Sequence, residues 1–468
     1  MKKGFFIFSI FAVIANSIYA QNNTLLFGST YIPQGNVINP AFYPDNNTFH
    51  ISLPGINPEL HIPLSYNELF KNDPSGQTHY INAWEVGEKF MTNNNMFLNT
   101  DIQHFGLGLR IKNLFATFSS RTKLSVHIGA PTEIATIFAN KFRGLANEEI
   151  TITDKNMMQA SAYNEYALGA GYTFGNLTVG TRVKILNGIC DFRTTETNFN
   201  LKFNEDGNLG EALIDYSALS TGTQLFRQKS VGNVMSTIFS TKNWGMALDL
   251  GAKYQWNFLE VTASILDIGK GIHWKNDVIS ITPKSNNPII VDNSDFGHIV
   301  FDNWDSLRSA FSGSLDSIQA NDSTRGNDYW TSIPTKLNLG ATVHIGKMCR
   351  AGILFHGEWD KSISFFDKSG KPADKTLFRH NTSLVFGVNL ANWIELMASM
   401  AVVKDGNKAD WFNPGLGINL SLGKFLQFYA LANYVSSFKY KDIKSANLQI
   451  GLNLMFGKGL AKVVNDVE

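Results

Sequence analysis

The sequence alternates apolar with small or polar residues in segments of about ten residues, and this pattern strongly limits what the chain can fold into. In 447–456 the apolar positions are Leu448, Ile450, Leu452, Leu454 and Phe456. The intervening positions, apart from Met455, are small or polar: Asn447, Gln449, Gly451 and Asn453. Because side chains of a strand point alternately to its two faces, each segment predicts one face for hydrocarbon and one for a polar interior.

The connections between these segments alternate between short and long. Short joints are expected around Lys112, Gly175-Asn176, Asn257, Lys347, Ala391 and Gly423. Long excursions are expected at 54–99, 121–157, 192–242, 269–333 and 361–380, with shorter ones near 404–410 and 439–444. A soluble sandwich also alternates, but this regular loop asymmetry is typical of outer-membrane barrels, which have short periplasmic turns and long extracellular loops.

Six hairpins, a first strand near 47–53 and a last strand at 445–456 together predict an all-β protein. We expect a single transmembrane antiparallel β-barrel of about 14 strands, closed so that every backbone group is paired in lipid. An even strand count places both termini in the periplasm. After residue 20 no apolar run reaches the eighteen or more residues of a membrane helix.

Composition agrees with a lipid-facing exterior. Charged residues make up only 17% of the chain and aromatic residues 12%, and Lys+Arg (40) balances Asp+Glu (39). Without a basic surplus, nucleic acid is not an expected partner, whereas outer-membrane lipid is. Common catalytic and phosphate-binding motifs and zinc-spaced cysteines are missing, so we expect no enzyme, no catalytic residues, no metal and no cofactor. Cys190 and Cys349 fall at opposite ends of strands and should not pair.

The N-terminal region divides into a targeting segment and a rigid coil. Residues 1–20 have the basic start, short apolar run and Ala20 cleavage site of a secretory signal peptide. Residues 21–46 contain GNVINPAFYP, where Pro40 and Pro44 prevent a long helix or a regular strand. We expect this segment to be either a hatch folded inside the lumen or a tail that simply leads into the barrel (47–456), which a periplasmic tail (457–468) follows.

The motif Asn39, Pro40 and Ala41, placed between a signal peptide and the first strand of a barrel, resembles the N-terminal hatch of the FadL-like family of outer-membrane transporters. The resemblance extends to the PorV-like barrels of type IX secretion and to uncharacterised barrels related to them, which the run 266–274 also resembles. It implies that the Asn-Pro-Ala segment enters the lumen. Asn39 can bond its own backbone in a turn while Pro40 fixes the bend.

The polar face of the strands carries charges of both signs. The expected lumen residues are Arg110, Glu165, Arg182, Lys184, Asp249, Lys253, Glu260, Lys336, Arg350, His356 and Glu358. They either line a hydrated interior and anchor the hatch, or they include a carboxylate-binding site built from Arg110, Arg182 or Arg350, since arginine fits carboxylates with two hydrogen bonds.

Three long excursions carry apolar stripes at helical spacing. They are Ala83, Val86 and Phe90; Ile134, Ile137, Phe138 and Phe142; and Leu307, Phe311, Leu315 and Ile318. Such helices pack on one another, cap the barrel mouth or bind a partner. Two functions remain open: passive transport of small hydrophobic molecules past a hatch, and a PorV-like role in binding secreted or surface proteins for export or surface assembly.

Overall fold

The computed structural model describes most of the chain from residue 23 to residue 457. The described ranges are 23–44, 47–72, 79–90, 95–129, 131–155, 157–222, 242–283, 289–290, 299–301, 321–346, 348–360, 365–366, 372–373, 377–391, 393–405, 408–423 and 425–457. The expected signal peptide (1–20) and C-terminal tail (457–468, except Gly457) lie outside these residues. No helix within them is long and apolar enough to cross a membrane.

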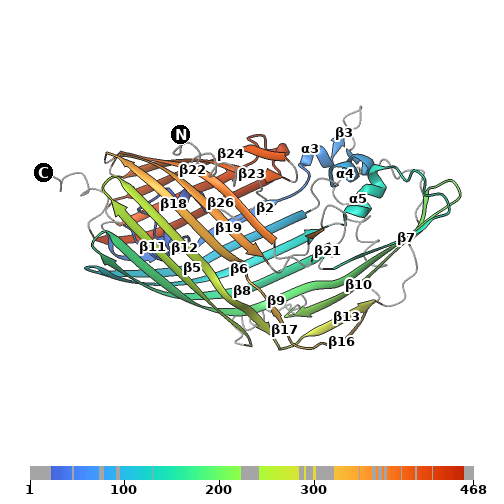
Figure 1. The fold of residues 1–468 in the computed structure, drawn as a ribbon, viewed down its shortest axis with the longest axis horizontal. Helices are drawn as coiled ribbons and strands as arrows, with labels where there is room; N and C mark the ends of the chain where they lie inside the picture. Colours follow the sequence, from blue (N-terminus) through green and yellow to red (C-terminus); the bar gives the residue numbers. More distant parts are fainter. Residues whose placement is uncertain are drawn as a thin grey trace, which may run out of the picture.

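Fourteen strand positions form a closed antiparallel barrel (Figure 1). β1 (Asn47–Ser52) and β2 (Gly55–His61) share the first position and pair with both the second and the last strand, which closes the wall. The other positions, in order, are β5 (Asn95–Ile111), β6 (Leu114–Gly129), β8 (Met158–Phe174), β9 (Leu177–Phe203), β11 (Asn243–Trp256), β12 (Leu259–Trp274), β18 (Thr335–Ile345), β19 (Cys349–Asp360), β22 (Leu377–Ala391), β23 (Ile394–Asp405), β24 (Lys408–Leu422), β25 (Leu426–Val435) and β26 (Ser445–Gly457). The predicted fold class is confirmed.

The two faces of the wall follow the sequence alternation. On β11, Met246 and Leu250 are 64% and 43% exposed on the outer surface, whereas Asp249 is fully buried inside. Trp244 and Trp256 are also exposed, at opposite ends of this strand. Their separation along a strand that rises ~3.4 Å per residue and tilts by ~40° corresponds to about 30 Å across the barrel, close to the ~25 Å apolar band of outer-membrane barrels.

The short turns gather at one end of the barrel, which we call the short-turn end. They contain residues with left-handed backbone, including Lys112, Gly175, Asn257 and Gly423 (φ 52 to 68°). The first strand begins and the last strand ends here, and the opposite end is called the long-loop end. Cys190 and Cys349 are unpaired, as expected.

Several predicted excursions prove to be strands, which corrects the sequence-based boundaries. Residues 55–61 continue the first strand after a break at Pro54, which has no N–H for the ladder. Residues 404–410 are likewise mostly strand, in β23 and β24.

The largest correction concerns 121–157, 192–242 and 269–333. There β6 and β9 continue beyond the barrel with β7 (Glu149–Asp154), β10 (Leu209–Thr221), β13 (Ile279–Pro283), β14 (Ile289–Ile290), β16 (Asn321–Arg325) and β17 (Tyr329–Thr331) to form a protruding sheet (Figure 1). Outside the membrane no face must be apolar, so the lipid-facing pattern disappears while the pairing continues. In this sheet, polar side chains of neighbouring strands form hydrogen bonds with each other, such as Thr151–Asn200 (2.8 Å) and Thr153–Asn198 (2.6 Å).

Two of the three helices predicted in the loops are present, and they pack on each other. α4 (Ala83–Phe90) contacts α5 (Thr132–Ala139), where the Trp84 ring lies 6.3 Å from Phe138 and 4.9 Å from Phe142. Phe142 in turn packs on Phe203 of the protruding sheet, so the helices cover one of its faces. The third stripe, 307–318, lies outside the described residues.

The remaining elements are short. α3 (Tyr66–Leu69) is tied to η4 (Tyr440–Asp442) of the last loop by a hydrogen bond of 2.7 Å from Asn67 to Asp442. A small sheet joins β3 (Lys71–Asn72), β4 (His79–Ile81) and β15 (Ile299–Phe301). β20 (Phe365–Phe366) pairs with β21 (Pro372–Ala373).

A buried carboxyl makes the stability of the protruding sheet depend on pH. Burial raises the pKa of Asp154 to about 7. The negative charge of Glu133 also raises this pKa, whereas a hydrogen bond from the Lys155 backbone lowers it. Because the folded state holds this proton more tightly than the unfolded state, local stability is greatest below pH ~4 and declines as pH rises through 7. We expect hydrogen exchange of 149–154, corrected for intrinsic rates, to show more protection at pH 5.5 than at pH 8. Asp154→Asn should remove most of this difference; an equal pH dependence in the variant would contradict the assignment.

Candidate functional site

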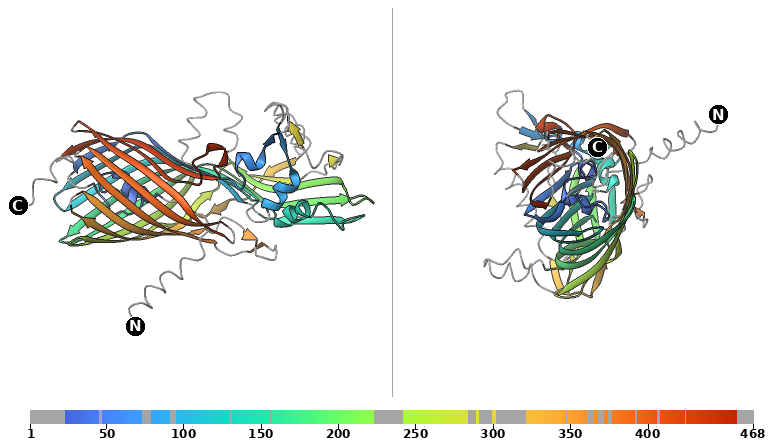
Figure 2. Two further views of the ribbon diagram at one scale, coloured as in Figure 1. Left: turned by 90° about the horizontal axis from the view of Figure 1, so that it is seen from above. Right: turned by 90° about the vertical axis from the view of Figure 1, so that its left-hand side faces the viewer.

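The N-terminal segment 23–44 lies inside the barrel, and we call it the hatch. Figure 2 shows this blue segment within the ring of strands when the short-turn end faces the viewer. It contains two short helices, α2 (Thr24–Phe27) and η1 (Pro33–Val37), and otherwise runs as coil. These helices were not predicted, but both are short enough to fit between the constraints of Pro33 and Pro40.

Part of the hatch forms an apolar core with the barrel wall. The members of this core are Leu25, Leu26, Phe27, Ile32 and Ile38 from the hatch and Leu354, Val385, Met397, Tyr429 and Leu431 from the wall. Leu25 and Leu26 have no exposed surface. This core packs the hatch against β19, β22, β23 and β25 of the wall.

The Asn-Pro-Ala motif bonds to the wall and to itself. Asn39 is 2% exposed, and its side-chain amide donates hydrogen bonds to the carbonyl oxygens of Ala252 (3.0 Å) and Ala263 (3.2 Å) on β11 and β12. Its Oδ1 accepts a hydrogen bond of 2.9 Å from the backbone N–H of Ala41, which closes a tight turn around Pro40. Ala41 is buried as well.

Glycines in the wall make room for the hatch at two places. A Cβ on Gly180 or Gly251 would come closer than 3.0 Å to the backbone of Pro40 or to the Asn39 side chain. A Cβ on Gly340 would come within 2.5 Å of the Phe27 ring. These glycines occupy lumen-facing positions of the strands, so the small residues in the polar half of the alternation were the sequence signal for close approach by another segment.

Buried charges form a network across the wall beside the hatch. Arg182 pairs with Asp249 at 3.3 Å and with Glu165 at 3.4 Å. Lys184 pairs with Asp249 at 2.8 Å and with Asp267 at 2.6 Å. All five side chains are at most 3% exposed. Their mutual pairing offsets the cost of removing each charge from water.

Charged side chains of the wall also bind the hatch. Arg182 donates to the Asn36 carbonyl oxygen at 2.8 Å. Arg350 forms an ion pair with Glu395 and donates to the Gly28 carbonyl oxygen, while Ser29 donates to Glu395 at 2.8 Å. Two of the three arginines considered for a ligand carboxylate therefore bind the hatch.

The other predicted lumen residues lie at different heights. At the short-turn end, the Arg110 guanidinium stands 4.4 Å above the Tyr43 ring, and Lys253 lies 3.9 Å from Glu260. At the long-loop side, Glu358 is 4% exposed and lines a cavity. The predicted residues are therefore not one site: they border the hatch on both sides.

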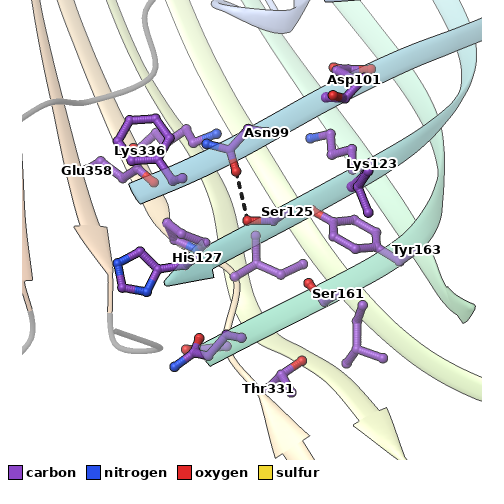
Figure 3. Close-up of a pocket in the computed structure, with 18 of the residues that line it drawn as sticks. Asn99, Asp101, Lys123, Ser125, His127, Ser161, Tyr163, Thr331, Lys336 and Glu358 are labelled. Carbon is purple, nitrogen blue, oxygen red and sulfur yellow. Dashed lines mark hydrogen bonds between the residues drawn. The ribbon is translucent and has the colours of Figure 1, made fainter. Parts of the chain in front are cut away.

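This cavity, which we call the vestibule, has a volume of about 150 Å³. Its walls come from the long-loop parts of β5, β6, β8 and β18, and Asn23 and Val37 of the hatch contribute to its lining. Figure 3 shows its polar residues, with a hydrogen bond of 2.8 Å from Ser125 to Asn99. A smaller cavity of about 40 Å³ continues beside the hatch and shares Asn23, Val37, Lys123 and Lys336 with the vestibule.

Sequence reasoning missed the uncharged residues through which the hatch binds. Gln34 and Asn453 exchange two amide hydrogen bonds of 2.9 and 3.1 Å, and the Ser29 and Asn36 contacts are equally specific. Asparagine, glutamine and serine are common in any coil, so their spacing in the sequence did not identify them as contacts between the hatch and the wall. Lys123, Asp267 and Glu395 were also missed, because they stand outside the clearest alternating segments.

Fold and site together define a class of protein: a transmembrane β-barrel whose lumen is filled by its own N-terminal segment. The chain belongs to a family described as "Family of unknown function (DUF5723)", whose profile matches residues 40–433. That match begins within the Asn-Pro-Ala motif and covers most of the barrel. Among curated proteins no sequence matches the chain.

Solved structures of bacterial transporters resemble the chain weakly over nearly its whole length. The toluene transporter TbuX of Ralstonia pickettii is 10% identical, with 91% of this chain and 94% of that one covered and a TM-score of 0.42. A FadL homologue of Pseudomonas aeruginosa is 9% identical, with 95% and 96% covered and a TM-score of 0.42. The toluene transporter TodX of Pseudomonas putida is 11% identical, with 95% of each chain covered and a TM-score of 0.40. Likenesses of this size do not carry a ligand from those proteins to this one.

Proposed function

We propose that the protein is a passive transporter of the outer membrane in which the hatch is the gate. The short turns and both termini face the periplasm, and the vestibule faces the outside. One observation carries the proposal: the packed hatch lies between the vestibule and a small cavity that the hatch itself forms with Lys253 and Glu260 of the wall. The vestibule ends on Asn23 and Val37, while the small cavity, of about 20 Å³, lies toward the short-turn end beside Ser29 and Pro44.

The contacts that hold the hatch suit a gate. Besides the apolar core, they are single hydrogen bonds from the wall to backbone carbonyl oxygens, such as those from Arg182 and Arg350, together with amide pairs. Each typically contributes only about 0.5–3 kcal/mol, and water can replace them when the segment moves. The resemblance of the motif implies a small hydrophobic solute, but the polar vestibule favours a more hydrophilic one.

A second candidate function is a PorV-like component that binds exported or surface proteins. The observation that favours it is the protruding sheet with α4 and α5, which extends well beyond the barrel wall (Figure 1). In that case the hatch would stay in the lumen permanently, and no solute would need to pass through the barrel.

Locking the hatch distinguishes the two functions. A Cβ on Gly28 would stand 3.9 Å from the Cβ of Val385, within the ~3.5–4.5 Å range of disulfides. We expect Gly28→Cys/Val385→Cys, in a Cys190→Ser/Cys349→Ser background, to support swelling of proteoliposomes in small sugars when reduced. Oxidation should reduce the rate at least tenfold, and reductant should restore it.

The two single-cysteine variants in the same background control for oxidation itself and should not respond. Swelling that continues unchanged with the disulfide formed would show that solutes pass without movement of the hatch. A complete lack of swelling in the reduced protein would favour the protein-binding function.

A further inference from the structure

The vestibule contains one cation that the protein does not neutralise by contact. Lys123 pairs with Glu165 at 2.8 Å, and Arg193 binds Asp191 through two hydrogen bonds of 2.8 and 3.0 Å. Lys336, by contrast, has no hydrogen bond or ion pair with any residue in the described part of the chain. Its charge acts on Asp267 only across a distance longer than an ion pair, so its ammonium group is available to an incoming anion.

Lys336 and Lys123 occupy the junction between the two cavities. Both residues line the vestibule and also the smaller cavity beside the hatch, together with Asn23 and Val37. A solute that moves from the vestibule toward the hatch must pass these two lysines. Lys184 lines the inner cavity as well, but Asp267, with which it pairs at 2.6 Å, lines the same cavity and balances its charge.

The rest of the lining is mixed: hydroxyl and amide groups stand beside the apolar side chains of Val37, Phe97, Leu124, Ile272, Ile333 and Pro334. Its polar part includes Asn99, Thr100, Ser125, Gln159, Ser161, Tyr163 and Ser332. Asp101 and Glu358 add carboxylates, which accept hydrogen bonds from hydroxyl groups. Asp101 keeps one oxygen, Oδ1, without a partner among the described residues, since Arg121 binds the other at 3.0 Å.

A wholly apolar solute would match the apolar part of this lining but leave its polar groups without hydrogen bonds. It would displace water from Lys336 and from the hydroxyl groups without replacing the lost hydrogen bonds, which costs about 1–3 kcal/mol for each group. The size of the cavity sets a second limit. At about 30 Å³ for each water molecule, a volume of about 150 Å³ corresponds to roughly five water molecules, so the ligand must be small.

We propose that the vestibule binds a small hydroxylated monoanion, of the sugar-acid or hydroxy-acid class. The carboxylate pairs with Lys336, and the hydroxyl groups bond to the neutral polar side chains of the lining. The inference rests on the proposed transport function only for the direction of entry, because binding in the vestibule needs no movement of the hatch. It differs from the expectation of a hydrophobic solute and from the arginine-based carboxylate site.

Calorimetric titration of the full-length mature protein in detergent tests the proposal with four probes. We expect D-galacturonate to bind at least tenfold more tightly than D-galactose, which lacks the charge. Laurate and toluene, an apolar anion and an apolar neutral molecule, should bind more weakly than galacturonate. Lys336→Gln should weaken galacturonate binding at least tenfold and leave the weak galactose binding unchanged.

Lys275→Gln is the matched control, because it removes one positive charge from an exposed site at the long-loop end of β12. This variant should bind galacturonate within twofold of the parent. Equal binding of galacturonate and galactose, tighter binding of laurate or toluene, or an unchanged Lys336→Gln variant would each overturn the proposal. Binding without hatch-dependent swelling would instead reject transport and leave this inference standing, whereas gated swelling without binding would do the reverse.

Discussion

Deleting residues 21–44 is expected to convert a nearly silent barrel into a steadily conducting pore. The hatch supplies the side chains that fill the lumen, including Leu25, Leu26 and Phe27. Wall residues left behind around this space include polar or small ones, such as Gly180, Gly251 and Asn453, beside the apolar wall residues of the hatch core. Water and ions should therefore enter once the segment is gone.

The wall should survive this deletion because closure does not depend on the hatch. β1 and β2 pair directly with β26, and every neighbouring pair of barrel strands keeps its ladder. Glu395 and Arg350 lose their hatch partners but keep each other and gain water. Planar-bilayer conductance measures the result, and heat-modifiable gel mobility verifies that the truncated barrel is folded.

A point substitution should also open the lumen, without removing the hatch from the chain. Gly251→Val places a branched side chain where Asn39 lies, and so should expel the motif and raise conductance. Gly210→Val is the control, since a Cβ there has only the Lys202 carbonyl oxygen within 4 Å, at 3.7 Å. If intact and truncated proteins conduct alike, the segment is no plug, and the transport proposal loses its gate.

Sequence alone predicted the barrel because the membrane imposes a simple rule on each strand. Lipid requires an apolar face, so the exposed Leu107 and the buried His50 and Asn453 follow from position parity. The same rule explains the failures. Beyond the membrane, strands such as β7 and the end of β9 need no lipid-facing side: one face packs partly under α4 and α5 and the other meets water, so their polar residues look like loops.

The site was less predictable than the wall for a different reason. The Asn-Pro-Ala turn could be predicted because Asn39 and Pro40 act locally, through their own backbone. The contacts of Arg182 with Asn36, or of Arg350 with Gly28, join residues more than a hundred positions apart. Such pairs depend on which strands stand next to the hatch in the closed barrel, and neither charge nor spacing in one sequence determines that. Lys336 gains its role only because its neighbours leave it without a partner.

The second large effect is expected on the lipid side of the wall, where Leu250→Arg should destabilise the barrel by about 2–4 kcal/mol. Leu250 is 43% exposed and lies midway between Trp244 and Trp256, near the centre of the apolar band. A guanidinium at this depth either enters hydrocarbon or draws water and headgroups inward. Equilibrium unfolding by urea in lipid vesicles, followed by tryptophan fluorescence, measures the change.

Ile345→Arg separates the effect of depth from that of charge. Ile345 is even more exposed, at 59%, but it ends β18 at the short-turn end, next to the turn at Gly346. There the side chain reaches the headgroups directly, so the cost should be only about 0–1 kcal/mol. The difference between the two variants therefore reports the position of the bilayer along the strands. Equal costs would mean that the exposed apolar surface is not centred on Leu250, and that the assigned membrane band must move along the barrel axis.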